Sequence, residues 1–426
     1  MPSLARTAFS AHPNAASPPP IRAASALPPA PSSRVEPITV ITRIAARGSL
    51  APFIAMDVMR EANARETSAR ALAGRRVLHL EVGQPSTPAP ARVRDAARTA
   101  IATERLGYTD ALGLPELRQR IARHYAETYG VVVDWRRIAI TTGSSGAFIL
   151  AFLAAFDPGD RVCVATPGYP AYRNILAALG VDVALLEVGE ESRYQPTPSL
   201  IDAAGGRFNG LIVASPANPT GTMLDGEALR RLAGYCAARG AWLISDEIYH
   251  GITYGAPAVT ALAVSDSAIV VNSFSKYYAM TGWRLGWLVL PEALLRPVEC
   301  LAQNLFISPP TISQRAALHA FDCARELDDN VARYARNRRL LLDGLPRAGF
   351  ARLAPADGAF YIYAELGGPN PDSVAFARRM LIETDVAATP GIDFDPRRGT
   401  RFIRFSFAGE TDEISEAIER LIAWRQ

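Results

Sequence analysis

Two patterns of hydrophobic and polar positions alternate along the middle of the chain. Short, nearly continuous apolar runs predict strands at 138–141, 161–165, 181–186, 211–214, 242–245, 268–272 and 285–290. Apolar residues that recur every three or four positions predict helices at 51–73 and 116–129. Helices are also predicted at 90–105 and 225–239, and a continuous apolar run predicts one at 147–156. Strands without polar alternation indicate a sheet that is covered on both faces. The pattern therefore predicts the α/β class, with a mostly parallel sheet between two layers of helices.

The pattern changes near residue 318. A long helix at 327–345, strands at 359–363 and 402–407, and helices at 373–383 and 412–425 indicate a smaller α+β domain. We draw the boundaries as a tail at 1–48, an arm with a short strand (77–82) at 49–82, a large domain at 83–318 and a small domain at 319–426.

The tail is rich in Ala, Pro and Ser and lacks periodic apolar residues, so we expect disorder there. An arginine-rich start with few acids is also typical of organelle transit peptides. Its prolines interrupt any amphipathic helix, so an extension without function is the favoured interpretation and a transit peptide the alternative.

Charge and cysteine content exclude several classes. The first fifty residues hold five arginines and one glutamate, so of the total charge of +3 the remainder carries only −1. Such a balance gives no argument for nucleic acid, and no apolar run approaches the roughly 20 residues of a membrane helix. The four cysteines form no CxxC pair. We therefore expect reduced, mostly buried thiols, a cytoplasmic location and no metal site.

Lys276 is the only lysine of the chain, against 44 arginines among 45 basic residues. Lysine can lose its proton and attack a carbonyl, which arginine cannot do. Bias towards arginine explains the missing lysines, but not why the remaining one follows two serines and precedes an arginine. Lys276 is thus a candidate for amine chemistry.

Four predicted strands end in chemically useful residues. Gly143, Ser144 and Ser145 follow the first, and small residues that open a helix can cradle phosphate. The other three ends carry Asn218, then Asp246 with Tyr249, then Ser273, Ser275 and Lys276. In open α/β sheets ligands bind beyond the carboxyl ends of the strands.

Pyridoxal phosphate needs all of these groups: an amine for its aldehyde, donors for its phosphate and phenolate oxygen, and an anion for its pyridine nitrogen. The segments NPTG (218–221), DEIY (246–249) and SFSKYYAMTGWRLG (273–286) resemble the fold-type I, pyridoxal-phosphate-dependent aminotransferases of the class I/II (aspartate aminotransferase-like) family. The resemblance covers about residue 51 to the C-terminus. It implies that the large domain binds the cofactor and that the arm packs with the small domain.

The resemblance also implies roles. Lys276 would form the internal aldimine and move the substrate proton, which requires a lowered pKa. Asp246 would pair with the pyridine nitrogen, and Tyr249 and Asn218 would donate to the phenolate oxygen. Tyr169 would stack on the ring.

The phosphate would lie among several small or cationic residues: Gly143, Ser144, Ser145, Ser273, Ser275 and Arg284. Tyr108 would reach the phosphate of a neighbouring subunit, which makes the protein a homodimer with shared active sites. Arg404 would bind the substrate carboxylate with bidentate geometry, with Gly83 and Asn218 beside it.

Structural interpretations stand beside these roles. They are a helix cap for Asp246, a surface position for Arg284 and a core-edge salt bridge for Arg404. Phe360 and Tyr361, in a GAFY segment, suit either the core or a pocket wall. His79 and His250 have no partner at a suggestive spacing, and we expect them to be structural.

The sequence thus predicts an aminotransferase that works by a ping-pong cycle. One alternative is a pyridoxal-phosphate-dependent β/γ-lyase or an enzyme like aminocyclopropane-carboxylate synthase, and another is a non-catalytic aminotransferase-like regulator. Some aspartate-type relatives carry a lysine where this chain has Ser145, and Gln84 stands where relatives often have Glu. We therefore expect a neutral or hydrophobic amino donor.

Overall fold

The computed structural model describes residues 43–71, 74, 76–350, 352–369 and 371–425. Internal contacts divide the chain into residues 1–44 and 45–426, and the fold described below is that of the second unit. Most of the predicted tail (1–42) lies outside the described residues. Its end differs from the expectation, because Ala46–Gly48 form a turn of 3-10 helix. No helix in the described ranges is long and apolar enough to cross a membrane.

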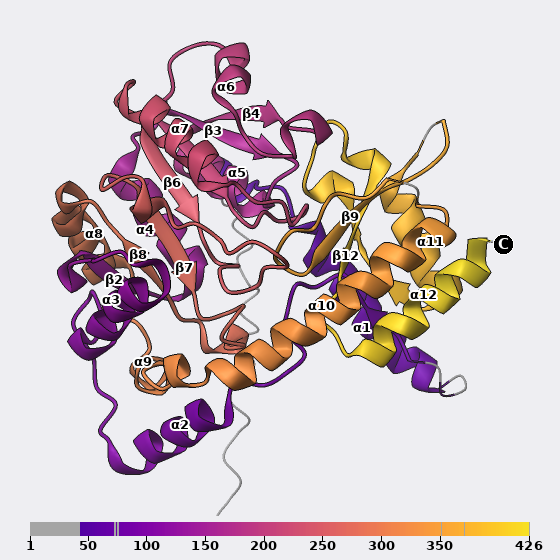
Figure 1. The fold of residues 1–426 in the computed structure, drawn as a ribbon, viewed down its shortest axis with the longest axis horizontal. Coiled ribbons are helices and arrows are strands. Elements are labelled where there is room, and N and C mark those ends of the chain that lie inside the picture. The colour runs from indigo at the N-terminus through magenta and orange to yellow at the C-terminus, as the bar shows by residue number, and fades with distance from the viewer. Residues whose placement is uncertain (1–42, 72–73, 75, 351, 370, 426) are drawn as a thin grey trace, which may run out of the picture. The chain divides into compact units, whose positions relative to one another are not determined.

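A seven-stranded sheet forms the centre of this unit, with the strand order β2-β8-β7-β6-β5-β3-β4 (Figure 1). Neighbouring strands from β4 to β7 pair in parallel, whereas β8 is antiparallel to both β7 and β2. The prediction of a mostly parallel sheet is confirmed. The strand bounds are β2 (Ile138–Thr141), β3 (Arg161–Thr166), β4 (Asp182–Glu187), β5 (Gly210–Ala214), β6 (Trp242–Asp246), β7 (Ile269–Ser273) and β8 (Gly286–Val289).

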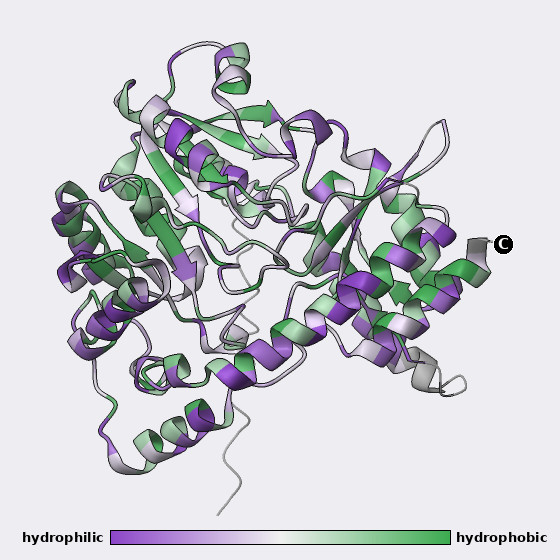
Figure 2. Cartoon of the chain, viewed as in Figure 1, coloured by the Kyte–Doolittle hydropathy of each residue, from purple (hydrophilic) through white to green (hydrophobic). Residues whose placement is uncertain are grey.

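The strands are apolar on both faces because helices cover both. Along β7, Ile269 and Val271 pack into one hydrophobic cluster, and Val270 between them packs into another. Figure 2 shows the inner strands mainly in green, beside helices with purple stripes. This burial explains why the sequence shows continuous apolar runs instead of alternation.

The helices extend the predicted set. The sequence analysis missed α5, α6, α8 and α9, and α4 begins at Gly143 instead of 147. The small residues of the first turn of α4 carry no apolar periodicity, which explains that error. The bounds are α1 (Ile54–Ala71), α2 (Ala91–Thr103), α3 (Pro115–Tyr129), α4 (Gly143–Ala155), α5 (Pro170–Leu179), α6 (Pro198–Ala204), α7 (Gly226–Ala237), α8 (Glu292–Leu305), α9 (Thr311–Ala317), α10 (Ala324–Arg347), α11 (Ser373–Thr384) and α12 (Thr411–Arg425).

The C-terminal part builds a second, smaller sheet. Strands β9 (Tyr361–Glu365), β12 (Phe402–Ser406) and β11 (Thr389–Pro390) pair antiparallel in the order β11-β12-β9. A two-residue strand from the arm, β1 (Leu78–His79), pairs with β10 (Val386–Ala387), so the predicted strand at 77–82 is shorter than expected. Helices α10, α11 and α12 accompany these strands (Figure 1).

The arm packs on this C-terminal part. Ala62 of α1 lies in one hydrophobic cluster with Leu381 of α11 and Ala387 of β10. This contact agrees with an arm that belongs to the small domain, and we keep the domain boundaries drawn from the sequence as a proposal. The four cysteines are free thiols, and Cys163, Cys236 and Cys323 are buried, as expected.

Candidate active site

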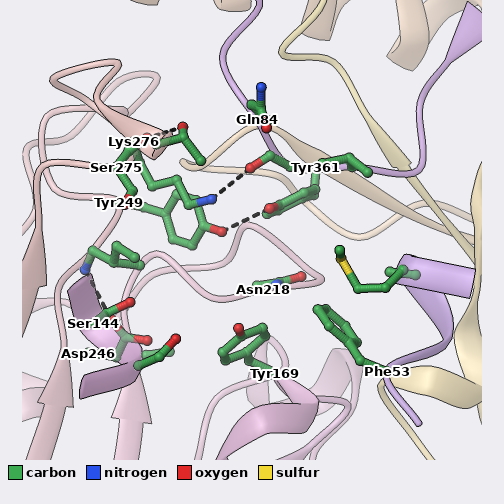
Figure 3. A pocket seen from close by; sticks show the side chains of 18 of the residues that line it. Phe53, Gln84, Ser144, Tyr169, Asn218, Asp246, Tyr249, Ser275, Lys276 and Tyr361 are labelled. Atoms are coloured by element: carbon green, nitrogen blue, oxygen red, sulfur yellow. Dashed lines mark hydrogen bonds between the residues drawn. The ribbon is translucent and has the colours of Figure 1, made fainter. Parts of the chain in front are cut away.

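A cavity of about 490 Å³ lies where the large sheet, the start of α1 and the small sheet meet (Figure 3). Most residues predicted from the sequence line it, although they come from segments far apart in the chain. These residues are Gly83, Ser144, Ser145, Tyr169, Asn218, Asp246, Tyr249, Ser275, Lys276, Arg284 and Arg404. Gly143, Ser273 and Tyr108 lie outside the lining.

Lys276 follows the carboxyl end of β7, and its Nζ donates a hydrogen bond to the carbonyl of Gly83 at 2.7 Å. Burial, together with the positive charges of Arg404 and Arg284, lowers the pKa of this amine to about 8, whereas Asp246 opposes the shift. With a pKa of about 8, roughly a tenth of these amines is uncharged at pH 7, far more than for an ordinary lysine, and the uncharged form is the nucleophile.

Asp246 is the last residue of β6 and is buried. Its carboxylate accepts hydrogen bonds from the backbone N–H of Ile248 at 3.1 Å and from the hydroxyl of Tyr172. Burial raises the pKa of Asp246 to about 6, against the effect of these hydrogen bonds and of Lys276. No cation among the described residues pairs with it, so a cationic N–H group in the cavity would stabilise its charge.

Tyr172 is a residue that the sequence analysis missed. It lies on α5, one helical turn after Tyr169, and both rings face the cavity. The only signal in the sequence was the spacing of three residues, which puts two side chains on the same side of a helix.

Tyr249 and Tyr361 form a pair of buried phenols whose hydroxyl oxygens are 2.8 Å apart (Figure 3). The two interpretations of the GAFY segment separate here: Phe360 packs in the core, and Tyr361 lines the cavity. Since successive side chains of a strand point to opposite faces, neighbours can have different roles.

The first turn of α4 contains the residues that the sequence suggested as a phosphate cradle. Gly143 has φ +74°, a conformation that favours glycine, and a Cβ there would lie 2.4 Å from Nη2 of Arg284, so that this guanidinium would have to shift. Ser144 and Ser145 follow it at the helix N-terminus, where backbone N–H groups are available to an anion. Ser273 lies behind this surface, and its Oγ contacts Oγ of Ser275 at 2.9 Å.

Arg404 lies in the middle of β12 and is 2% exposed. Its Nη1 donates to Oδ1 of Asn218 at 3.0 Å, and its Nη2 donates to the Glu81 carbonyl at 2.5 Å and to Thr389 Oγ1 at 3.1 Å. The rings of Tyr361 and Phe394 lie 4.4 and 4.6 Å from its guanidinium carbon.

Arg404 has a nearby acid in Asp393: burial raises the pKa of that carboxyl and the charge of Arg404 opposes this effect, but the two form no ion pair. Among the described residues no carboxylate lies within ion-pair distance of the Arg404 guanidinium, and its Nε has no hydrogen-bond partner. The salt-bridge interpretation is therefore not what the structure shows. A buried, unpaired guanidinium is costly, and a carboxylate entering the cavity would remove that cost.

The start of α1 provides an apolar wall: Phe53, Ala55, Met56 and Met59 all line the cavity. The carboxylate of Asp393 holds this helix end, accepting hydrogen bonds from the backbone N–H groups of Ile54 and Ala55, each at 3.1 Å. The sequence predicted the helix but not its place at the cavity.

Tyr108 follows α2, is 84% exposed, and does not contribute to the cavity of its own chain.

Glu247 is next to Asp246 in the sequence but does not line the cavity. It is buried, accepts hydrogen bonds from Ser245, Thr260 and the Ala261 backbone, and burial raises its pKa to about 8.

The two histidines lie outside the cavity lining and make hydrogen bonds that suit the structural role expected of them. His79 Nδ1 lies 2.8 Å from a carboxylate oxygen of Glu81, a bond that raises the pKa of this histidine. His250 bonds the Tyr129 hydroxyl at 2.9 Å and the Ser215 carbonyl at 3.0 Å.

Known proteins with similar sequences and structures agree on one family. The family "Aminotransferase class I and II" matches residues 75–421. A valine–pyruvate aminotransferase of Mycobacterium tuberculosis is 51% identical over 90% of this chain and 98% of its own length. An aspartate/prephenate aminotransferase of Thermus thermophilus is 33% identical over 80% of this chain and 89% of its own.

Among solved structures, an aminotransferase from Mycobacterium tuberculosis superposes with a TM-score of 0.86 at 50% identity. It covers 90% of this chain and 99% of its own. The fold, the site and these relatives lead to one conclusion: the chain belongs to the class I and II aminotransferases, which move an amino group from an amino acid to a 2-oxo acid.

Proposed function

We propose that the chain uses pyridoxal phosphate bound through Lys276 to transfer the amino group of a neutral, aliphatic amino acid to a short 2-oxo acid. The observation that carries this proposal is one cavity with three matched groups. They are an amine of lowered pKa (Lys276), a buried carboxylate that makes no ion pair with a described residue (Asp246) and a buried guanidinium that makes none either (Arg404).

The residues present fit the cofactor. Asp246 would hold the pyridine N–H, and Tyr249 with Asn218 would hold the phenolate oxygen. The start of α4, with Ser275 and Arg284, would hold the phosphate. When bound, pyridoxal phosphate supplies an electron-withdrawing ring that accepts the electrons of the breaking Cα–H bond.

The other steps belong to the protein. Arg404 binds and orients the substrate carboxylate, and its partners Asn218 and Glu81 hold the guanidinium in place. Lys276 Nζ would take the proton from the substrate Cα and hold it for its return to the reacting carbon, which needs the uncharged amine. The apolar start of α1 helps to exclude water.

Two observations support a neutral donor. Of the described residues that line the cavity, the cations are Lys276, Arg284 and Arg404, and each already has a proposed role. No further cation is available there for a distal carboxylate, while Phe53, Met56 and Met59 offer apolar surface. The 51% identical relative is named as acting with valine and pyruvate, whereas the 33% identical one is named for aspartate and prephenate.

The test is the absorption spectrum of the purified enzyme during the addition of single amino acids. We expect a visible cofactor band that disappears with valine and returns with pyruvate, and no covalent cofactor band in Lys276→Arg, which keeps the charge but lacks the amine chemistry. Release of ammonia without storage of the amine would point to a lyase. The best kcat/KM with aspartate or glutamate would reject the neutral donor.

We also propose a homodimer in which Tyr108 enters the cavity of the partner. Its 84% exposure in a single chain is the support. Mixing Tyr108→Ala with Lys276→Ala should produce hybrid dimers in which one site has both an intact lysine and an intact tyrosine. Activity in the mixture that does not exceed that of the separate variants would contradict shared sites.

A further inference from the structure

Tyr361 connects the groups proposed to bind the cofactor and the substrate. Its hydroxyl lies 2.8 Å from that of Tyr249, and its ring lies under the guanidinium of Arg404 at 4.4 Å. Tyr361 is 2% exposed and Tyr249 5%. Within the described part of the chain, each hydroxyl has only the other as its hydrogen-bond partner.

The position of Tyr361 is fixed from several sides. A Cβ at Gly83 would lie 1.6 Å from its hydroxyl oxygen, so the phenol occupies space that only a glycine leaves free. The carbonyl of the same Gly83 accepts the hydrogen bond of Lys276 at 2.7 Å. The ring also meets the ring of Tyr249 edge to face, with centroids 5.7 Å apart. The hydroxyl therefore has little freedom to turn towards another partner.

The number of available protons decides which of the two hydroxyls donates in the hydrogen bond between Tyr249 and Tyr361. A phenol has one proton to donate, and its oxygen also accepts. In the proposed function, on which this step rests, Tyr249 donates to the phenolate oxygen of the cofactor. Its oxygen is then the acceptor in the pair, and Tyr361 must be the donor.

The surroundings favour the same direction. Burial raises the pKa of both phenols, that of Tyr249 well above 10, while the charge of Arg404 is the main opposing effect at Tyr361. The more acidic phenol is the better hydrogen-bond donor. A hydroxyl that accepts such a bond also becomes a stronger donor itself.

We propose that Tyr361 is a positioning residue, which donates its proton to Tyr249 and so directs the proton of Tyr249 towards the phenolate oxygen of the bound cofactor. The phenolate form of the bound cofactor would thereby persist to lower pH. The small sheet, which also carries Arg404, thus contributes to the electronic properties of a cofactor held mainly by the large sheet.

The test is a pH titration of the visible absorption band of the holoenzyme. Tyr361→Phe removes the hydroxyl and keeps the ring under Arg404. Tyr254→Phe is the matched control: its hydroxyl donates to the Ala359 carbonyl at 2.7 Å, on the same segment but outside the cavity lining. Tyr249→Phe and the double variant Tyr249→Phe/Tyr361→Phe complete the set.

We expect Tyr361→Phe to raise the pH midpoint of this titration by about half a pH unit to one pH unit, which is the size expected from losing one neutral hydrogen bond. Tyr254→Phe should not move it. Tyr249→Phe should raise it further, and the double variant should match Tyr249→Phe alone, because Tyr361 acts only through Tyr249.

An unchanged midpoint in Tyr361→Phe, or a double variant in which the two shifts add, would overturn this inference while leaving the proposed function intact. A wild-type protein that takes up no pyridoxal phosphate would instead overturn the proposed function, and the role of Tyr361 with it.

Discussion

Replacing Gly83 by alanine measures how tightly the cavity is packed around Tyr361. The new Cβ would lie 1.6 Å from the hydroxyl oxygen, 2.5 Å from Cζ and 2.8 Å from Cε1 of that ring. These distances are far below van der Waals contact, so either the ring or the backbone must move. The φ angle of Gly83 lies outside the left-handed region, so alanine suits the backbone and the penalty is purely steric.

Three contributions set the expected size. Overpacking a buried site costs about 1–3 kcal/mol, and losing the hydrogen bond between Tyr361 and Tyr249 costs about 0.5–1.5 kcal/mol. Replacing glycine by alanine at a permissive backbone position opposes this with about 0.4–1 kcal/mol, because the unfolded chain loses entropy. We expect Gly83→Ala to lower the free energy of unfolding by about 2 kcal/mol.

The assay is urea unfolding of the cofactor-free, full-length chain at one protein concentration, since bound cofactor would add its own stabilisation. The wild type, Gly83→Ala, Tyr361→Leu and the double variant form a double-mutant cycle. Leucine ends before the three ring atoms that the added methyl group would meet, so in that background the penalty should vanish. An equal penalty for Gly83→Ala in both backgrounds would refute the packing argument.

Three further predictions concern charge and helix capping. The rate at which the cofactor-free protein takes up pyridoxal phosphate, followed by absorbance, should rise as pH increases through about 8, where Lys276 loses its proton. Arg404→Gln should move the pH midpoint of this rise upward, because it removes a positive charge that lowers the pKa of Lys276. A midpoint that does not move in this variant would contradict the assignment of the rise to Lys276. Asp393→Ala removes two hydrogen bonds that cap α1, so we expect the free energy of unfolding in urea to fall by about 1 kcal/mol. We also expect kcat/KM to fall more for valine than for alanine as the amino donor, because the methyl group of alanine buries little surface on the apolar wall. Tyr172→Phe removes a hydrogen bond that favours the ionised form of Asp246. We expect the Kd for pyridoxal phosphate, measured by fluorescence titration, to rise about tenfold. An unchanged Kd would show that this hydrogen bond does not matter for binding.

The central sheet and the chemistry at its edge were predictable from the sequence. Continuous apolar runs are enough to predict buried strands, and parallel strands present their carboxyl ends on one side. Lys276, Asp246 and Asn218 could therefore be assigned to one site, because each follows or ends such a run. The start of α4 was predicted four residues late, because its small first residues carry no regular apolar spacing.

The residues that complete the site come together only through contacts between distant segments. Tyr361 meets Tyr249 across 112 positions of sequence, and Asp393 reaches Ala55 across 338. No local pattern contains such distances, because they depend on how the small sheet and α1 pack against the large sheet. For Arg404, the strand was predictable from the sequence, whereas its burial without an ion-pair partner among the described residues depends on the fold. Local sequence specifies which groups a strand carries, and packing between distant segments decides which of them meet.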